Sequence, residues 1–265
     1  MSDLEIFAFI ASVFLSLKGW LTWYGDIASV NRLRVPVSKR LVLLTAPLAC
    51  LVLILVVLTK LGATTVRSDP LYISFYLLVG AGWLGGVTLI FPFLGISARD
   101  DVLERGNRAA SWAVSGALAG TSCSFAGGNA GNGPGVEAVL FSAALSSALF
   151  IGLWLGMDLL TSISDAITVD RDERAGIRLG GLLLGIGLLS GWSVAGNWVS
   201  ASATLKEFAA SSWPAILLTA VAVIVELAFR KASVHLSAKT IPSLVISTVY
   251  VGLPLVWIVT RGVQS

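Results

Sequence analysis

Hydrophobic residues along this chain fall into eight long runs that are separated by short polar segments. A helix needs about 20 mostly apolar residues to cross roughly 30 Å of hydrocarbon. The runs cover residues 4–24, 41–59, 71–94, 109–125, 136–163, 179–195, 213–229 and 241–259. This pattern predicts an all-α, polytopic membrane protein of about eight transmembrane helices.

The composition agrees with a membrane environment. Hydrophobic residues make up 56% of the chain and charged residues only 12%, whereas about a quarter of the residues of a soluble domain are charged. The lipid bilayer is therefore the first partner that we predict.

Basic residues are unevenly divided between the loops. If the N-terminus lies outside, thirteen Lys and Arg fall in inner loops and four in outer segments, with Lys18 inside the first run. Inner loops of membrane proteins carry the excess of Lys and Arg, so we predict that both termini lie on the outer side. These residues are spread over four short loops, which fits anionic lipid headgroups, and no nucleic-acid partner is expected.

Glycine pairs spaced four residues apart recur in the third to the sixth run. Such spacing lets helix backbones approach closely in lipid. The predicted packing residues are Gly82, Gly86, Gly116, Gly120, Gly152, Gly156, Gly181, Gly185, Gly187 and Gly191. We expect these four helices to form a tight core, with the other four more peripheral. A homo-oligomer seam would use the same glycines, so both alternatives remain open.

Two similar phrases open the fourth and the sixth run. Residues 104–110 read Glu-Arg-Gly-Asn-Arg-Ala-Ala and residues 170–176 read Asp-Arg-Asp-Glu-Arg-Ala-Gly. Both begin on the predicted inner side, and a glycine-rich apolar helix follows each. The recurrence predicts a duplicated helix-pair module whose two copies are parallel.

The predicted organisation has three parts. A three-helix membrane segment covers residues 1–101, and a C-terminal membrane helix occupies residues 230–265. Between them, residues 102–229 form a duplicated four-helix module with copies at 102–165 and 166–229.

The paired phrases resemble the signature of the bacterial inner-membrane family known as domain of unknown function 350, in which each copy opens with an asparagine-containing phrase. The resemblance covers residues 102–229 and includes Asn107 in the first copy. The second copy has Asp172 and Glu173 where the family has asparagine. Membership implies an inner-membrane location and an envelope-related role, and it supplies no activity.

The segment 127–135 contains five glycines in nine residues. One interpretation is a hairpin whose glycines end one helix and begin the next through positive φ angles. The other is a pocket or pore mouth, where backbone N–H groups and asparagine amides bind a solute or an anion. Gly196-Asn197 follows the sixth run as Gly128-Asn129 follows the fourth. The candidate ligand residues are Asn129, Asn132 and Asn197.

Two further candidates lie within the fifth run. Ionisable residues in membrane spans are costly and often functional, and Asp158 lies toward the inner end of this run. Ser146 lies near its middle, and both are candidate ligand or pore residues. Glu226 is expected to pair with Arg230, four residues further along a helix. Mid-depth positions offer no carboxylate or histidine relay, which disfavours a proton-driven transporter.

Motifs typical of enzymes are missing from the sequence. It has no His-Glu-x-x-His, phosphate loop, Cys-x-x-Cys or Gly-x-Ser-x-Gly, and its one histidine, His235, lies in a basic loop. We therefore expect no enzyme activity, no cofactor and no metal site.

The leading hypothesis is a non-enzymatic inner-membrane protein with an assembly or envelope-related role, which acts as a homo-oligomer or with a membrane-protein partner. The alternatives are a channel or facilitator that passes an ion or small solute at the Gly/Asn loop, and an intramembrane enzyme of unrecognised type.

Overall fold

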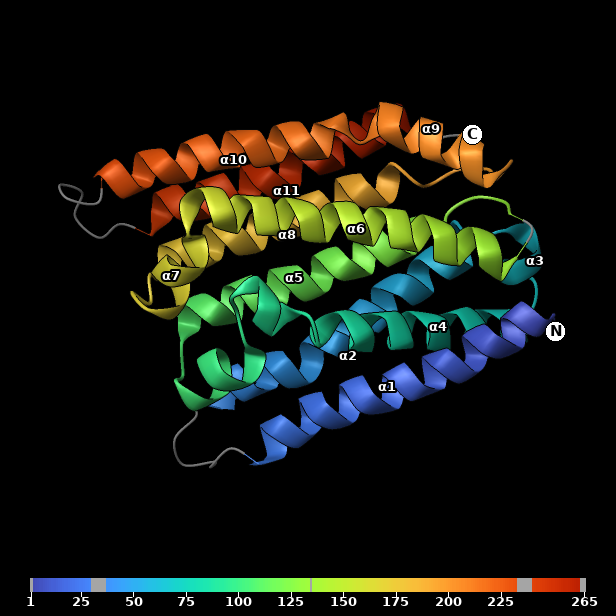
Figure 1. The fold of residues 1–265 in the computed structure, drawn as a ribbon, viewed down its shortest axis with the longest axis horizontal. Coiled ribbons are helices and arrows are strands. Elements are labelled where there is room, and N and C mark those ends of the chain that lie inside the picture. Colours follow the sequence, from blue (N-terminus) through green and yellow to red (C-terminus); the bar gives the residue numbers. More distant parts are fainter. Residues whose placement is uncertain (1, 30–36, 134, 233–239, 263–265) are drawn as a thin grey trace.

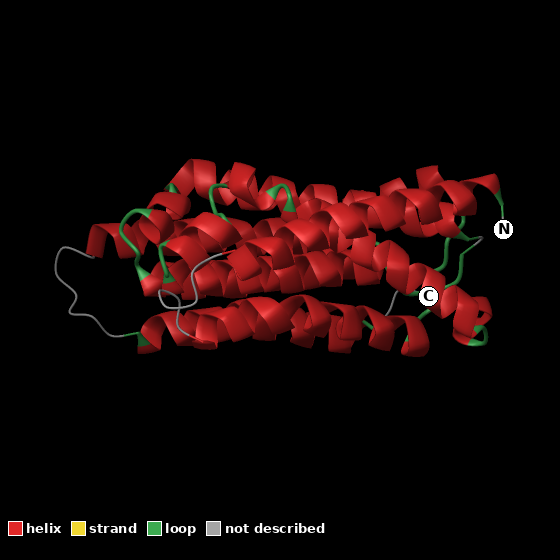
Figure 2. Cartoon of the chain, turned by 90° about the horizontal axis from the view of Figure 1, so that it is seen from below, coloured by secondary structure: helices red, strands yellow, loops and turns green. Residues whose placement is uncertain are grey.

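The computed structural model describes residues 2–29, 37–133, 135–232 and 240–262, and these residues contain helices and no strand (Figure 2). Eight long helices lie along the long axis of the molecule, and both termini lie at the same end (Figure 1). The long helices are α1 (Asp3–Ser29), α2 (Val37–Lys60), α4 (Pro70–Thr88), α5 (Arg108–Gly127), α6 (Val136–Thr161), α8 (Glu173–Trp192), α10 (Trp213–Ala232) and α11 (Ile241–Arg261). The all-α prediction is confirmed.

Short helices connect some of the long ones. They are α3 (Thr64–Arg67), the 3₁₀ helix η1 (Phe91–Leu94), the π-helix η2 (Ala98–Glu104), α7 (Ile163–Thr168) and α9 (Ala201–Ser211). Helix α3 and the segment 127–133 lie at the end that carries the termini, which we call the pocket end because a pocket opens there. Helices η2 and α7 lie at the opposite end, which we call the basic end.

Seven of the helices in the described part of the chain are long and apolar enough to cross a membrane, and α5 is the long helix that falls short. Its sequence is rich in Ala, Ser and Gly, and thirteen of its twenty residues are buried. A helix that other helices surround needs few lipid-facing side chains, so it can run alongside spanning helices without being strongly apolar. The predicted number of eight therefore becomes seven candidate spans around α5.

Helices α5 and α8 form the centre of the bundle, and their backbones touch along much of their length. A Cβ atom added at Gly116 would meet the backbone of Gly180, and one added at Gly187 would meet the backbone of Gly120. Nearer the pocket end, a Cβ at Gly191 would meet the Cys123 carbonyl. Only glycine permits so close an approach, which explains why small residues recur on both helices.

Close packing extends to two helices that we expected to be peripheral. A Cβ at Gly82 of α4 would lie 2.8 Å from Ser12 Cα of α1, while Gly86 faces the Leu15 side chain at 3.7 Å. A Cβ at Gly181 of α8 would lie 2.8 Å from the Cα of Ser247 in α11, and one at Gly185 would meet the Tyr250 carbonyl. The expectation that α1 and α11 stand apart from the glycine core was wrong.

Helix α6 uses its glycines differently. A Cβ at Gly152 or Gly156 would have nothing within 4 Å, so neither glycine makes a close helix contact with the described part of the chain. Trp154, between them, points inward and is 1% exposed. The prediction of intramolecular packing was wrong for this pair, although eight other predicted glycines do contact a neighbouring helix.

Several helix ends differ from the hydrophobic runs. The run at 71–94 breaks after Thr88, and Pro92 lies in the separate helix η1, because proline lacks the backbone N–H that continues a helix. Ser162, with φ of 45°, separates α6 from α7. Helix α8 begins at Glu173, six positions before the predicted start, because Asp172 accepts a hydrogen bond from Arg174 N and caps it.

A buried ion pair fastens α10 and α11 to α8. Arg178 and Glu226 are each 3% exposed. The Arg178 guanidinium donates from Nε and Nη2 to the two Glu226 carboxylate oxygens, at 2.7 and 2.6 Å, and from Nη1 to the Ser243 hydroxyl at 2.9 Å. Its carbon Cζ also lies 4.5 Å from the Phe229 ring centroid. The predicted partner of Glu226, Arg230, instead donates to the Ser162 carbonyl.

Candidate functional site

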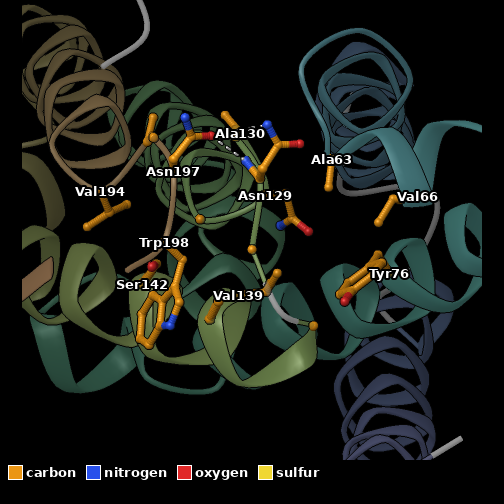
Figure 3. Close-up of a pocket in the computed structure, with 18 of the residues that line it drawn as sticks. Ala63, Val66, Tyr76, Asn129, Ala130, Val139, Ser142, Val194, Asn197 and Trp198 are labelled. Carbon is orange, nitrogen blue, oxygen red and sulfur yellow. Dashed lines mark hydrogen bonds between the residues drawn. The ribbon is translucent and has the colours of Figure 1, made fainter. Parts of the chain in front are cut away.

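A pocket of about 460 Å³ opens at the pocket end of the bundle (Figure 3). One wall comes from the start of α4 and from α3. Further lining comes from the segment 128–133 after α5, the first turns of α6, the segment 193–198 after α8 and part of α9. Glu5 of α1 and Leu58 of α2 also line the pocket. The pocket therefore lies where the two central helices end.

The two segments that follow α5 and α8 are joined by backbone hydrogen bonds. Gly196 N donates to the Ala130 carbonyl at 2.8 Å, and Trp198 N donates to the Asn132 carbonyl at 2.8 Å. The Asn197 Oδ1 accepts from both Asn132 N and Asn132 Nδ2, at 3.0 and 3.2 Å. The segments 128–133 and 193–198, which we call the floor of the pocket, are thus held together although they are distant in the sequence.

The hydrogen bonds between Asn132 and Asn197 show that Asn132, and not Asn129, is the partner of Asn197. Asn132 and Asn197 are 65 positions apart, and each ends an Ala-Gly-Asn triplet whose glycine has a positive φ, 119° at Gly131 and 149° at Gly196. The comparison of Gly128-Asn129 with Gly196-Asn197 was therefore wrong. Gly131 N also donates to the Leu61 carbonyl, at 3.0 Å, which connects the floor to the end of α2.

Asn129 has one polar atom in use and one available to the pocket. Its Nδ2 donates to the Phe125 carbonyl at 3.0 Å, and the side chain is buried, with 6% exposed. A carbonyl accepts only from a donor, so this bond fixes which end of the amide faces the pocket. Among the described residues, the Asn129 Oδ1 has no partner, so it presents an acceptor to the pocket.

Two buried hydroxyls are placed in the same way. Ser142 of α6 is 4% exposed and Tyr76 of α4 is 2% exposed. Both line the pocket, and neither hydroxyl has a hydrogen-bond partner within the described part of the chain. In Figure 3 the Asn129 side chain lies between Tyr76 and Trp198. The fully buried side-chain atoms without a partner in the described chain belong to Ser16, Trp154 and Trp257, so Asn129 Oδ1 and these two hydroxyls are open to the cavity. Three open polar atoms around one cavity indicate a place where a solute or water binds.

The charges around the pocket are negative. The described lining includes the carboxylates of Glu5 and Glu207 and no lysine, arginine or histidine. This balance does not favour the anion that we considered from the sequence.

The other two candidate residues lie away from the pocket. Ser146, fully buried, donates from its hydroxyl to the Ser124 carbonyl at 2.8 Å, which is a contact between α6 and α5. Asp158, near the basic end, accepts from Ser164 N at 2.9 Å and caps α7. The structure thus brings together Asn129, Asn132 and Asn197 but neither Ser146 nor Asp158. Tyr76, Glu5 and Glu207 were missed, because their sequence neighbourhoods carry no signal of a shared pocket.

The repeated phrases of the sequence cap the central helices at the basic end. Asn107 Oδ1 accepts from Ala109 N and caps α5, while Asn107 Nδ2 donates to the Ile167 carbonyl at 2.6 Å. Asp172 caps α8, and the residues before these caps, Gly106 and Arg171, have similar φ angles of 60° and 55°. The aspartate therefore replaces the asparagine as a cap but does not reproduce the side-chain bond that Asn107 makes to α7.

Exposed side chains at the basic end form ion pairs. Arg99 donates to Glu104 at 3.1 Å and to Asp26 at 3.3 Å. The hydrogen bond to Glu104 raises the pKa of Arg99, and the charge of Asp26 adds to this. No group of three or more metal-ligating side chains occurs among the residues that the structure describes. His235 lies outside them.

Apolar spanning helices and a polar pocket at one end define a multi-pass helical membrane protein. The chain belongs to the family described as Domain of Unknown Function (DUF350), whose family model matches residues 41–194. The match begins before the predicted resemblance at 102–229 and ends earlier, so it includes α2 and α4 and leaves out α9 and α10. No curated protein and no solved structure matches the chain.

Proposed function

We propose that this chain is a non-enzymatic component of the bacterial inner membrane that binds a small polar solute at the outer face, as part of an envelope assembly. The observation that carries the proposal is the pocket onto which three polar atoms without a partner in the described chain open, and these atoms belong to the buried residues Asn129, Ser142 and Tyr76. Binding sites are concave, with a few converging polar groups, which this pocket resembles.

The distribution of charge supports an outward-facing pocket. Described arginines at the basic end include Arg99, Arg105, Arg108, Arg171 and Arg174, in keeping with a cytoplasmic face. Cysteine labelling tests this orientation, since both native cysteines are buried. We expect Ser68→Cys, at the pocket end, to react with a membrane-impermeant maleimide in intact cells, and Asp170→Cys to react only after permeabilisation. The reverse pattern would contradict the proposal.

The packing of α5 against α8 favours binding over conduction. Their backbones touch at Gly116, Gly120 and Gly191, which leaves no room for a solute path between them. The polar pocket nevertheless favours a second candidate, a facilitator that moves solute by another route. Flux of ions or small solutes above that of empty vesicles, in reconstituted liposomes, would support the second candidate, and its absence across a broad panel would exclude it.

Assembly with a partner is supported by the open side of α6. A Cβ added at Gly152 or Gly156 would meet none of the described residues within 4 Å, and small residues in membrane helices commonly mark helix contacts. We expect native crosslinking in membranes to capture a second copy or another membrane protein. A chain that stays monomeric and alone after crosslinking and gentle detergent extraction would contradict the assembly role.

The non-enzymatic part of the proposal is supported by the side chains around the pocket. Its described lining holds asparagine amides, hydroxyl groups and the carboxylates of Glu5 and Glu207, and it includes no histidine, lysine or cysteine that would activate a nucleophile. Conversion of any solute that the purified protein binds would contradict the assignment. Mass spectrometry of the bound solute after prolonged incubation is the direct check.

A further inference from the structure

We propose that the pocket binds a small organic cation, whose ammonium group lies among carboxylate, amide and aromatic groups. This inference rests on the proposed solute-binding role of the pocket and adds the chemical class of the solute.

The first support is the charge of the lining. Glu5 and Glu207 are its charged side chains among the described residues, and both are acidic. Glu5 is positioned at the start of α1 by the N–H of Ser2, which donates to its Oε2 at 2.7 Å. Glu207 lies on α9, on the other side of the pocket, and no ion pair is found for it within the described chain. A cation near Glu207 meets a carboxylate, and the described lining holds no lysine, arginine or histidine to repel it.

The second support is independent of the carboxylates. Asn129 is a buried residue, with 6% of its surface exposed. In the described chain, its polar side-chain atom without a partner is the acceptor Oδ1. The donor of the same amide is committed to the Phe125 carbonyl. Ser142 and Tyr76 add hydroxyl oxygens that also accept. The buried part of the pocket therefore offers an acceptor at Asn129 and two hydroxyls that accept or donate, which suits an N–H donor or a hydroxyl of a ligand.

The third support distinguishes an organic cation from a metal ion. Tyr72, Tyr76 and Trp198 line the pocket, and the Trp198 ring is held edge-on to Phe141, with ring centroids 5.5 Å apart. The face of an aromatic ring attracts an ammonium group, especially a quaternary one. Calcium and magnesium are bound instead by sets of oxygen ligands. A volume of about 460 Å³ accommodates a small molecule of this kind.

Titration of the purified full-length protein in nanodiscs tests the inference with two probes of the same shape. Choline carries a quaternary ammonium group, and 3,3-dimethyl-1-butanol replaces its nitrogen by carbon. Isothermal titration calorimetry should show that choline binds at least about fivefold more tightly than the alcohol, as expected for one cation–aromatic contact with carboxylates nearby. Potassium, magnesium and phosphate serve as further probes.

Two variants assign the effect to the pocket. Glu207→Gln should weaken choline binding about fivefold and leave binding of the alcohol unchanged. Glu137→Gln is the matched control, because Glu137 is an exposed carboxylate in the first turn of α6 and does not line the pocket. Both carboxylates are exposed, so neither change should lower the unfolding temperature.

The outcomes separate this inference from the proposed function. Three results would contradict the organic cation but not the solute pocket. They are equal binding of choline and the alcohol, a preference for magnesium or phosphate, and the same effect from Glu137→Gln as from Glu207→Gln. If none of the probes binds, both the cation and the pocket function are contradicted.

Discussion

Two buried polar groups in this bundle differ in whether their hydrogen bonds are complete. At the interface of α8, α10 and α11, Arg178 donates three hydrogen bonds to Glu226 and Ser243. At the pocket end, Asn129 and Ser142 are buried to a similar degree, yet each keeps an atom without a partner in the described chain. The first group holds helices together, and the second is open to a ligand.

The comparison teaches that burial of a polar residue does not by itself mark a site. A buried charge that loses its partner costs several kcal/mol, so complete pairing is expected wherever the role is structural. An incomplete set is tolerated where water or a solute completes it. Changes to the ion pair should therefore lower stability more than binding, and changes to the pocket residues should lower binding more than stability.

The largest effect is expected at the ion pair. Glu226→Gln should lower the free energy of unfolding by about 3–5 kcal/mol, because it leaves the Arg178 guanidinium buried and without a counter-charge. Chemical unfolding in mixed detergent micelles measures this loss.

The double variant Arg178→Met with Glu226→Leu is the control for that change. Replacement of both charges by apolar groups is often neutral, so it should recover most of the lost stability. Solute binding should survive in both variants if the ion pair is structural. Loss of binding in the more stable double variant would contradict the division between the two groups.

The next effect concerns the glycine contacts below the pocket. Gly187→Ala should destabilise the protein by about 1–3 kcal/mol, since the added methyl group meets the Gly120 backbone. Gly152→Ala, with nothing within 4 Å, should be neutral or raise stability by up to about 1 kcal/mol, because alanine favours the helix. Equal destabilisation by both, in the same unfolding assay, would argue against the α5–α8 contact.

A smaller effect is expected at Asp158. Asp158→Ala should cost about 1 kcal/mol, because Ser164 N loses the acceptor that caps α7. Solute affinity should remain that of the unchanged protein. A change in affinity without a change in stability would restore Asp158 as a ligand residue.

The smallest change in stability is expected at Ser142. Ser142→Ala removes a hydroxyl that bonds to nothing else in the described chain, so stability should stay within about 0.5 kcal/mol. Solute affinity should nevertheless fall, by about fivefold if one hydrogen bond is lost. Calorimetric titration measures the affinity, and a loss of stability above about 2 kcal/mol would mean that Ser142 is structural.

Much of the fold could be predicted from the sequence because apolar runs and glycine spacing report on each helix alone. The runs located all eight long helices, and glycines such as Gly120 and Gly187 do mark close contacts. Which helix touches which could not be read in this way. The pairing of Arg178 with Glu226 joins residues 48 positions apart, and the nearer Arg230 was the natural but wrong expectation.

The candidate site was predicted in part for a similar reason. The glycines and asparagines of 127–135 were visible as an unusual local sequence, and Asn197 was found by its resemblance to that segment. Tyr76 and Glu207 come from other helices whose local sequences are ordinary, so only the folded chain brings them to the pocket. Ser146 and Asp158 were chosen for their depth in the membrane, which does not report whether their hydrogen bonds are complete.

The contrast between open and completed polar groups is tested most directly on two serines one helical turn apart on α6. Ser142→Cys and Ser146→Cys should differ in the rate of modification by a small thiol reagent added to the purified protein in nanodiscs. Ser142 lines the pocket, whereas Ser146 is bonded to Ser124 in the core. We predict fast modification of Ser142→Cys, slowed by a bound solute, and almost none of Ser146→Cys. Equal rates at the two positions, or a rate at Ser142→Cys that no solute changes, would contradict a ligand-binding pocket.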